Sequence, residues 1–334
     1  MANLRDVAEH AGVSLATASR VASGSAAVRR ETRERVERAM RDLLYLPRRG
    51  PSSSGAIGLI VPDLANPIFP ALAQAMEVRA TAFGLATILC NARGSSLQEA
   101  DYVHMLLERN VDGMIFISSE AADDLGDHTH YARLREEGAR LVFVNGALPT
   151  LPAPAVGVDE RAAGELATRH LLQLGHRRIG FVAGPAQYRP TREKAVGREL
   201  ALREAGLADG GLVAHADFGV DGGRRALAAL LERDEPPTAV LCSSDLMAVG
   251  VLQEAAACGL SVPDDLSVVG FDGIDASAWT TPPLTTIAQP IEELAETAVS
   301  ALRTLIDEPE RELPQFLFRP RLVLRESTAA PVSP

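Results

Sequence analysis

The chain of 334 residues is 46% hydrophobic and 23% charged, with a formal net charge of −11. This composition is that of a globular protein of two or three domains, and it excludes a disordered or collagen-like chain. No apolar run approaches the roughly 20 residues of a membrane span, and the N-terminus lacks the apolar core of a signal peptide. The three cysteines form no CxxC pair, which argues against a disulfide framework or a zinc module. We therefore expect a reduced cytoplasmic protein with no cofactor, no metal and no membrane partner.

Positive charge is concentrated at the start of the chain. Residues 1–50 contain ten arginines and six acidic residues, a balance of +4, which leaves −15 for the remainder. A small basic segment on a large acidic body indicates that the N-terminal segment meets a polyanion and that the body does not.

Two short helices are predicted in this basic segment. Residues 4–10 show helical spacing, Gly12 can form a tight turn, and a second helix follows over residues 14–22. Small Ala8 and apolar Val21 would let the two helices cross closely, which is the helix-turn-helix pattern. A plain helical hairpin with an exposed polar face is the alternative.

The second helix would present small and hydroxylated residues and one arginine on its outer face. Such a surface fits a DNA major groove, where arginine pairs with guanine and small side chains contact phosphates or thymine methyls. We predict DNA contacts from Ser14, Leu15, Ala16, Thr17, Ser19, Arg20 and Ser23. A third helix from about residue 30 to residue 44 alternates arginine with glutamate, which is typical of a solvated face.

Short apolar runs alternate with amphipathic stretches through the rest of the chain. This alternation predicts parallel sheets covered by helices on both faces, and the number of units favours two similar halves. Polar residues follow many of the predicted strands, at the edge where open α/β sheets bind ligands. These residues are Asp63, Asn66, Asn91, Ser118, Ser119, Asn145, Asp159, Ser243, Ser244, Asp245 and Asp272. Helix capping would explain each one singly, but together they suit recognition of a polar small molecule.

No catalytic or phosphate-binding motif accompanies these residues. The patterns GxGxxG, GxxxxGK[ST], HExxH and GxSxG are absent, so the body is predicted to bind and not to catalyse. Two other functions stay open. One is a solute-binding protein of a transport system, against which the basic head argues. The other is an α/β enzyme acting on sugars or nucleotides, which the missing motifs disfavour.

Several motifs resemble those of LacI/GalR-type transcriptional regulators. The resemblance covers nearly the whole chain outside the linker and the last few residues. It rests on LRDVA (4–8), AGVS (11–14), SRV (19–21), IGLIVPD (57–63), LGHRRI (174–179), SDLMA (244–248), VGFD (269–272) and PLTTI (283–287).

The resemblance implies a domain organisation. Residues 1–46 would form an all-α helix-turn-helix DNA-binding head, and residues 47–55 a short linker. Residues 56–328 would form an effector-binding and dimerisation domain of the α/β, two-lobed, periplasmic-binding-protein type I. One lobe would take about 56–155 and 288–312, and the other about 156–287 and 313–328.

The linker departs from the family pattern, in which a hinge helix carries a leucine that enters the minor groove. Here the segment is shorter and lacks that leucine, and Gly50, Pro51 and three serines oppose a helix. We predict a flexible tether with Arg48 and Arg49 as phosphate contacts, which argues against minor-groove intercalation.

Strand-end position and the resemblance together predict the effector-binding residues. They are Asn66, Phe69, Ser119, Asp159, Arg192, Phe218, Ser244, Asp272, Trp279 and Gln289. Aromatic rings and carboxylates that accept hydrogen bonds from hydroxyls suit a sugar, a nucleoside or a related polyol. Core packing is the alternative for Phe218 and Trp279.

The resemblance therefore predicts an allosteric DNA-binding repressor. A small polar effector bound between the lobes would control its affinity for double-stranded, palindromic operator DNA. A homodimer would place two recognition helices in successive major grooves. The residues after Leu324 contain no apolar heptads, which favours a dimer over a tetramer built on a coiled-coil tail.

Overall fold

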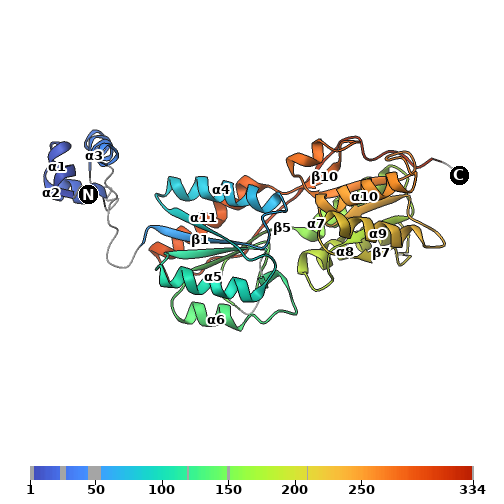
Figure 1. Ribbon diagram of the computed structural model, residues 1–334, viewed down its shortest axis with the longest axis horizontal. Coiled ribbons are helices and arrows are strands. Elements are labelled where there is room, and N and C mark those ends of the chain that lie inside the picture. Colours follow the sequence, from blue (N-terminus) through green and yellow to red (C-terminus); the bar gives the residue numbers. More distant parts are fainter. Residues whose placement is uncertain are drawn as a thin grey trace.

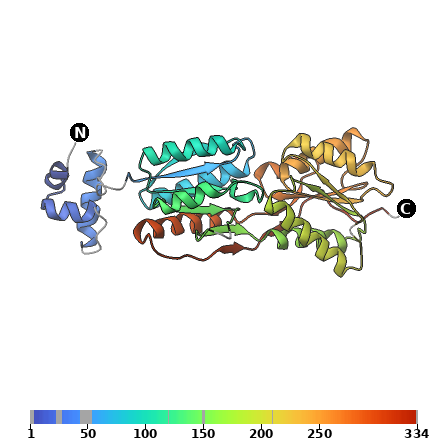
Figure 2. The ribbon, with the colours of Figure 1, turned by 90° about the horizontal axis from the view of Figure 1, so that it is seen from below.

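The computed structural model describes residues 4–22, 28–43, 54–118, 120–148, 151–208 and 210–332. A small helical head lies at one end of the long axis, and two α/β lobes follow it (Figure 1). The same order is seen in the perpendicular view, with the C-terminus at the far end from the head (Figure 2). Among the described helices, none is both long enough and apolar enough to span a bilayer.

Three helices form the head, and the predicted helix-turn-helix is confirmed. They are α1 (Leu4–His10), α2 (Leu15–Ala22) and α3 (Arg30–Asp42). Gly12 takes the positive φ of +62° in the turn, and the Ser14 hydroxyl accepts a hydrogen bond from the Thr17 amide at 3.1 Å. Val7, Ala8, Ala18, Val21, Val36, Ala39 and Met40 are buried between the helices.

The first lobe is a parallel sheet with helices on both faces. Its strand order is β11-β5-β4-β3-β1-β2. The strands are β1 (Ala56–Val61), β2 (Ala86–Asn91), β3 (Gly113–Ile117), β4 (Leu141–Val144), β5 (Ala155–Val158) and β11 (Phe316–Phe318). Helices α4 (Ile68–Ala82) and α11 (Ile291–Asp307) pack together on one face. On the other lie α5 (Ser96–Glu108), α6 (Thr129–Glu136) and the short 3₁₀ helix η1 (Glu120–Ala122).

The second lobe repeats this plan with the order β12-β10-β9-β8-β6-β7. Its strands are β6 (Ile179–Ala183), β7 (Val213–His215), β8 (Ala239–Cys242), β9 (Ser267–Asp272), β10 (Thr285–Ala288) and β12 (Arg321–Val323), of which β12 is antiparallel. Its helices are α7 (Glu160–Gln173), α8 (Arg189–Glu204), α9 (Val220–Leu231), α10 (Asp245–Ala257) and the 3₁₀ helix η2 (Asp275–Ala278). The predicted two-lobed α/β fold is confirmed.

The assignment of chain segments to the lobes needs one correction. Residues 156–158 and the strand after residue 313 were predicted in the second lobe, yet β5 and β11 pair with each other in the sheet of the first. Val156 is opposite Phe316, and Val158 is opposite Phe318. The chain therefore crosses between lobes after β5, after β10 and after β11, and only β12 of the last two strands belongs to the second lobe.

Most of the predicted linker lies outside the described residues, as do Ser23, Arg48, Arg49 and Ser119. Its last two residues are described and are attached to the first lobe. The amides of Ser54 and Gly55 each donate to a different oxygen of the Asp112 carboxylate at 3.0 Å. The start of β1 is thus held at the base of its sheet.

Glycines let α7 and α8 cross in backbone contact. A Cβ at Gly164 would lie 2.1 Å from the Lys194 carbonyl oxygen, and one at Gly197 would lie 2.0 Å from the Arg161 carbonyl oxygen. Neither position has room for a larger residue, so the pair sets the separation of the helices. This crossing brings α8 against the start of α7, where the chain enters the second lobe.

Candidate functional site

The outer face of α2 carries the predicted DNA contacts. Ser14, Leu15, Ala16, Ser19 and Arg20 are exposed, whereas the intervening Ala18 is buried against α1 and α3. Leu15 is 45% exposed, so its side chain is accessible to a binding partner.

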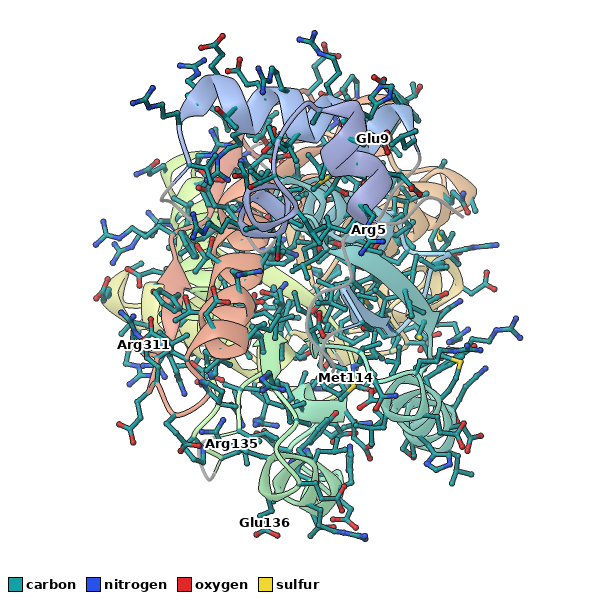
Figure 3. The ribbon with its side chains drawn as sticks, turned by 90° about the vertical axis from the view of Figure 1, so that its left-hand side faces the viewer. Arg5, Glu9, Met114, Arg135, Glu136 and Arg311 are labelled. Atoms are coloured by element: carbon teal, nitrogen blue, oxygen red, sulfur yellow. The ribbon has the colours of Figure 1, made fainter. Side chains whose placement is uncertain are left out.

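The start of α1 extends this surface. Leu4 and Arg5 border the same shallow hollow as Leu15, Ala16 and Ser19. Figure 3 looks onto this end of the molecule and shows Arg5 on α1. Apolar, hydroxyl and arginine side chains therefore share one surface of the head, which suits a major groove. Base contact by these residues stays a prediction.

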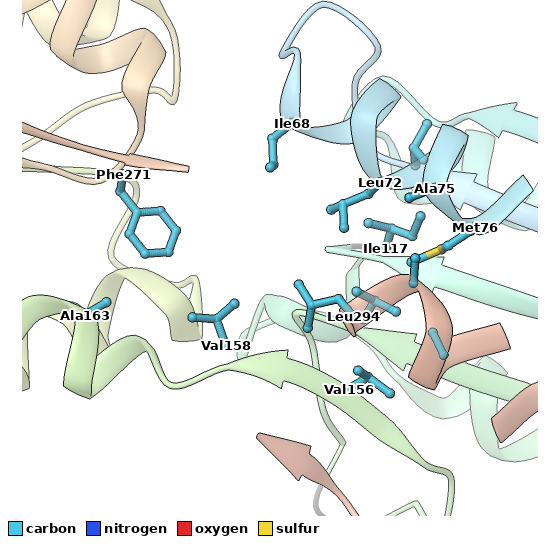
Figure 4. Packing of buried hydrophobic residues seen from close by; sticks show 14 of the residues in the cluster. Ile68, Leu72, Ala75, Met76, Ile117, Val156, Val158, Ala163, Phe271 and Leu294 are labelled. Atoms are coloured by element: carbon cyan, nitrogen blue, oxygen red, sulfur yellow. The ribbon is translucent and has the colours of Figure 1, made fainter. Parts of the chain in front are cut away.

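A cavity of about 490 Å³ lies between the two lobes, at the carboxyl ends of the strands. Six predicted effector residues line it: Asn66, Phe69, Phe218, Ser244, Asp272 and Gln289. Figure 4 shows the cores on either side, with Phe271 of the second lobe and Ile68 of the first facing the region between them. Effector binding by the six residues stays a prediction, but the fold brings them together.

Backbone strain is concentrated around this cavity. Among the described non-glycine residues, five have positive φ, and four of these line the cavity. The four are Arg93 (+49°), Ser118 (+43°), Asn145 (+53°) and Asp272 (+126°). Because such conformations cost of order 1–3 kcal/mol each and cluster at binding sites, their positions favour a functional cavity.

A chain of hydrogen bonds runs from one lobe to the other along the cavity. The Gln289 amide donates to Asp272 Oδ1 at 2.8 Å and accepts from the Asn145 amide at 2.9 Å. Burial, with the nearby Asp245 carboxylate, raises the pKa of Asp272, while the Gln289 hydrogen bond opposes the shift. Asp272 is therefore a buried carboxyl group with one oxygen already held in place by Gln289.

Two cations line the cavity, Arg93 and Lys194, and Lys194 is the only lysine in the chain. Its ammonium lies 2.5 Å from Glu160 Oε2 and 3.6 Å from the centroid of the Phe271 ring. Burial raises the pKa of Glu160, and the Lys194 charge opposes that rise. The pair is compensated internally, so the cavity offers fixed polar groups without a strong net charge.

Arg192 does not take part in this cavity, contrary to prediction. It precedes Lys194 by two positions on α8, which turns its side chain about 200° around the helix axis. There it pairs with Asp124 of the first lobe and donates to the Gln187 carbonyl at 2.9 Å. The sequence of α8 alone did not show which side of the helix faces the cavity.

Asp159 and Trp279 also lie outside the cavity lining. The Asp159 carboxylate caps α7 by accepting from the Ala162 amide at 2.9 Å, and it borders a second hollow of about 270 Å³ at the lobe crossing. Trp279 ends η2 with 78% of its surface exposed. Asp159 is held at the start of α7 by its capping hydrogen bond, and Trp279 is exposed because the end of η2 lies at the surface.

Several lining residues went unpredicted, among them Lys194, Glu160, Tyr188 and Phe271. The Tyr188 ring meets Phe218 edge-on, with centroids 5.7 Å apart. Glu160 and Tyr188 lie at helix starts, Lys194 lies within α8 and Phe271 lies inside β9, so none of them directly follows the end of a strand. The presence of a single lysine was the one available signal.

The rim of the cavity is held by contacts between the lobes. The Asp124 amide donates to the Gln187 carbonyl at 3.0 Å, and Asp123 forms an isolated antiparallel bridge with Tyr188. Arg189 pairs with the Asp124 carboxylate at 2.7 Å and donates to the Ala147 carbonyl at 2.5 Å. The loop after η1 thus closes against the start of α8.

Comparison with known proteins agrees with this geometry. Residues 3–48 match the model of bacterial regulatory proteins of the lacI family, and residues 168–328 match that of a periplasmic binding protein-like domain. The chain is 40% identical to the HTH-type transcriptional regulator MalR of Streptomyces coelicolor, covering 98% of this chain and 96% of the relative. It is 35% identical to the HTH-type transcriptional repressor CytR of Escherichia coli, covering 98% and 97%.

Solved structures show the same likeness. A complex of the transcriptional regulator CelR with cellobiose superposes with a TM-score of 0.75 at 31% identity, covering 98% of this chain and all of that chain. The lac repressor dimer bound to operator and an anti-inducer superposes with a TM-score of 0.76 at 30% identity, covering 98% and 99%.

Proposed function

The chain belongs to the LacI family of bacterial regulatory proteins, and on that premise we propose that it is a dimeric repressor controlled by a sugar. It is a DNA-binding transcriptional regulator with a small polar effector. The observation that carries the proposal is the cavity between the lobes, because it joins aromatic walls to fixed hydrogen-bonding groups. A solute-binding transport protein would leave the helix-turn-helix head without a role.

A sugar is the effector that the cavity favours. Phe69, Phe218 and Tyr188 offer ring faces and edges, on which the C–H faces of a pyranose or furanose can pack. The Asp272 carboxylate and the Asn145 amide offer acceptors and donors for hydroxyls. Lys194 is paired with Glu160, and the two cations of the lining, Lys194 and Arg93, are matched by the carboxyl groups of Asp63, Glu160 and Asp272. This near balance of charge favours a neutral ligand over a nucleotide.

Two solved relatives support this choice. The CelR structure is a complex with cellobiose, and a LacI family regulator from Enterococcus faecium with bound ribose has a TM-score of 0.73 at 31% identity, covering 82% of this chain and 99% of that chain. Those ligands belong to those proteins. What they support here is the ligand class, and we assign the cavity binding and no reaction.

We further propose that exposed hydrophobic side chains on both lobes are covered by a second copy. Val78 and Phe83, from α4 and its end, are 57% and 41% exposed, and Leu89 on the neighbouring edge strand β2 is 47% exposed. Trp279 in the second lobe is 78% exposed. Patches of this kind are uncommon on monomers. A twofold dimer would also match a palindromic operator.

The dimer is tested by sedimentation of the full chain. Phe83→Asp and Trp279→Asp are each expected to move the dimer toward monomer and to weaken operator binding. As a control, Leu125→Asp makes the same apolar-to-acidic change at a side chain that is 85% exposed and lies outside these patches, and it should leave the dimer intact. A chain that sediments as a monomer at micromolar concentration would contradict the proposal.

The DNA-binding surface is tested by binding to inverted-repeat fragments from the protein's own upstream region. Arg20→Ala should weaken the preferred fragment by about 1–3 kcal/mol and leave nonspecific DNA nearly unchanged, because a base contact is lost. Arg30→Ala on α3 removes the same charge from a side chain that is 93% exposed, and it should cost sequence preference much less. Equal losses in the two variants would remove Arg20 as a base reader.

A further inference from the structure

A group of side chains that could bind a metal ion lies in the first lobe, and none of them lines the effector cavity. It consists of Glu99 on α5, Glu120 on η1 and His130 on α6. One ligand atom from each lies within 4.8 Å of the others. Glu99 is only 3% exposed, and the other two are partly buried. Three separate elements therefore bring carboxylate and imidazole groups to one point.

The His130 ring is oriented as a metal ligand would be. Its Nδ1 lies 3.1 Å from the Asp127 carbonyl oxygen, and only a protonated Nδ1 can donate there. In the neutral ring, Nε2 then carries the lone pair, and it faces Glu99 Oε1 at 3.8 Å. A histidine that ligates a metal through one nitrogen usually donates its other N–H to such a carbonyl.

The spacing also suits a shared ion better than a direct hydrogen bond. At 3.8 Å the imidazole and carboxylate are too far apart for a good hydrogen bond. Two ligands on tetrahedral zinc, each about 2.1 Å from the metal, lie about 3.4 Å apart. Small side-chain rotations would close the difference.

Glu99 is held rigidly by its surroundings. The buried Tyr131 hydroxyl donates to Glu99 Oε1, and the Tyr131 ring packs edge-on against Phe116 and Phe143, with centroids 5.0 and 5.1 Å away. Among the described residues, the other oxygen, Glu99 Oε2, accepts one long hydrogen bond, from the Glu120 amide at 3.5 Å. That oxygen is therefore placed to accept a stronger partner.

Glu120 completes the set. Among the described residues, none donates a hydrogen bond to its carboxylate, and no arginine or lysine forms an ion pair with it or with Glu99. Burial and the neighbouring Glu99 carboxylate raise the pKa of Glu120, and the nearby His130 and His128 oppose that rise. A hollow of about 140 Å³ reaches both carboxylates and has room for water ligands.

We propose that Glu99, Glu120 and His130 bind one divalent transition-metal ion, for which zinc is the best match. Imidazole and carboxylate ligands suit zinc, and the hollow leaves coordination positions for water. The ion would fix η1 to α5 and α6. Since η1 leads directly into Asp123 and Asp124, it would also order the part of the first lobe that contacts Tyr188 and Arg189.

The test is zinc titration of the full, metal-stripped chain carrying Cys258→Ser, which removes the exposed thiol as a competing ligand. Isothermal titration should show one ion per chain, and zinc should raise the midpoint of thermal unfolding. Glu120→Gln and His130→Gln should each weaken binding about tenfold or more. Circular dichroism establishes that both variants are folded.

The matched controls are His104→Gln and Glu108→Gln. These residues form an exposed pair 3.4 Å apart on α5, with no third ligand, so their loss should leave zinc affinity unchanged. The proposal is overturned if the parent chain shows no saturable binding, or if either Glu120→Gln or His130→Gln binds zinc as tightly as the parent. It is also overturned if the control variants lose affinity equally.

Discussion

Replacing Gly197 with alanine tests the packing that carries Lys194 into the effector cavity. A Cβ at this position would lie 2.0 Å from the Arg161 carbonyl oxygen and 2.9 Å from the Glu165 amide nitrogen. Both obstacles are backbone atoms of α7, which cannot rotate away as a side chain can. Since ordinary contact begins near 3.4 Å, the helices would have to separate by about 1.4 Å, the difference between 3.4 and 2.0 Å.

Two effects of opposite sign decide the result. Overpacking of a tight contact costs about 1–3 kcal/mol, and a clash with backbone on this scale belongs at the upper end. Alanine in a helix interior is favoured over glycine by about 1 kcal/mol. We therefore expect Gly197→Ala to lower the free energy of unfolding by about 2 kcal/mol.

Urea unfolding followed by circular dichroism measures this difference. Gly219→Ala is the control, because nothing lies within 4 Å of its added Cβ and its φ is −125°. We expect it to change stability by less than about 1 kcal/mol. If Gly197→Ala instead stabilised the protein by about 1 kcal/mol, helix propensity alone would be acting, and the close crossing of α7 and α8 would be refuted.

Three further predictions concern the cavity, the rim of the cavity and the pH dependence of stability. Gly184→Ala places a Cβ 2.2 Å from the Phe218 ring, so it should displace that ring and weaken the sugar response in an operator-binding assay without weakening operator binding itself. Asp124→Asn removes the ion pairs with Arg189 and Arg192 across the rim; because these side chains are 28–43% exposed, we expect a loss of about 0.5–1 kcal/mol, seen as faster hydrogen exchange in residues 120–126. Burial raises the pKa of Asp245 from 3.8 to about 6, against the hydrogen bonds that it accepts. The folded protein therefore holds the Asp245 proton more tightly than the unfolded chain does. The stability that this proton contributes is complete below pH 3.8 and is lost as the pH rises through about 6. The difference in free energy of unfolding between the parent and Asp245→Asn should change between pH 3.8 and about 6 and stay constant above that. A difference that is constant from pH 4 to pH 7 would contradict the raised pKa of Asp245.

The head was predictable from sequence because its determinants are local. A glycine at the turn, a capping Ser14 and apolar residues at helical spacing lie within twenty residues of one another. The alternation of strands and helices likewise predicted two α/β lobes. Strand β11 was misassigned because it has three residues, and its partner β5 lies about 160 residues earlier in the chain.

The cavity was predictable only in part, and the reason is geometric. Residues after strands, such as Asn66, Ser244 and Asp272, meet at one edge whenever a parallel sheet forms. Lys194 lies instead within a helix, and its direction depends on the close crossing of α7 and α8, where Gly164 lies against the Lys194 backbone and Gly197 against the Arg161 backbone. Such a contact joins separate helices, and no pattern within α8 distinguishes Lys194 from Arg192.

The most direct test of the account is the affinity of the full chain for its operator as neutral sugars are added one at a time. Fluorescence anisotropy at fixed salt measures it, because salt alone changes protein–DNA affinity steeply. We predict that at least one sugar changes the operator Kd by about 5–150-fold, and that Asp272→Asn abolishes this response. An operator affinity that no sugar alters, or a response that persists in Asp272→Asn, would contradict the account.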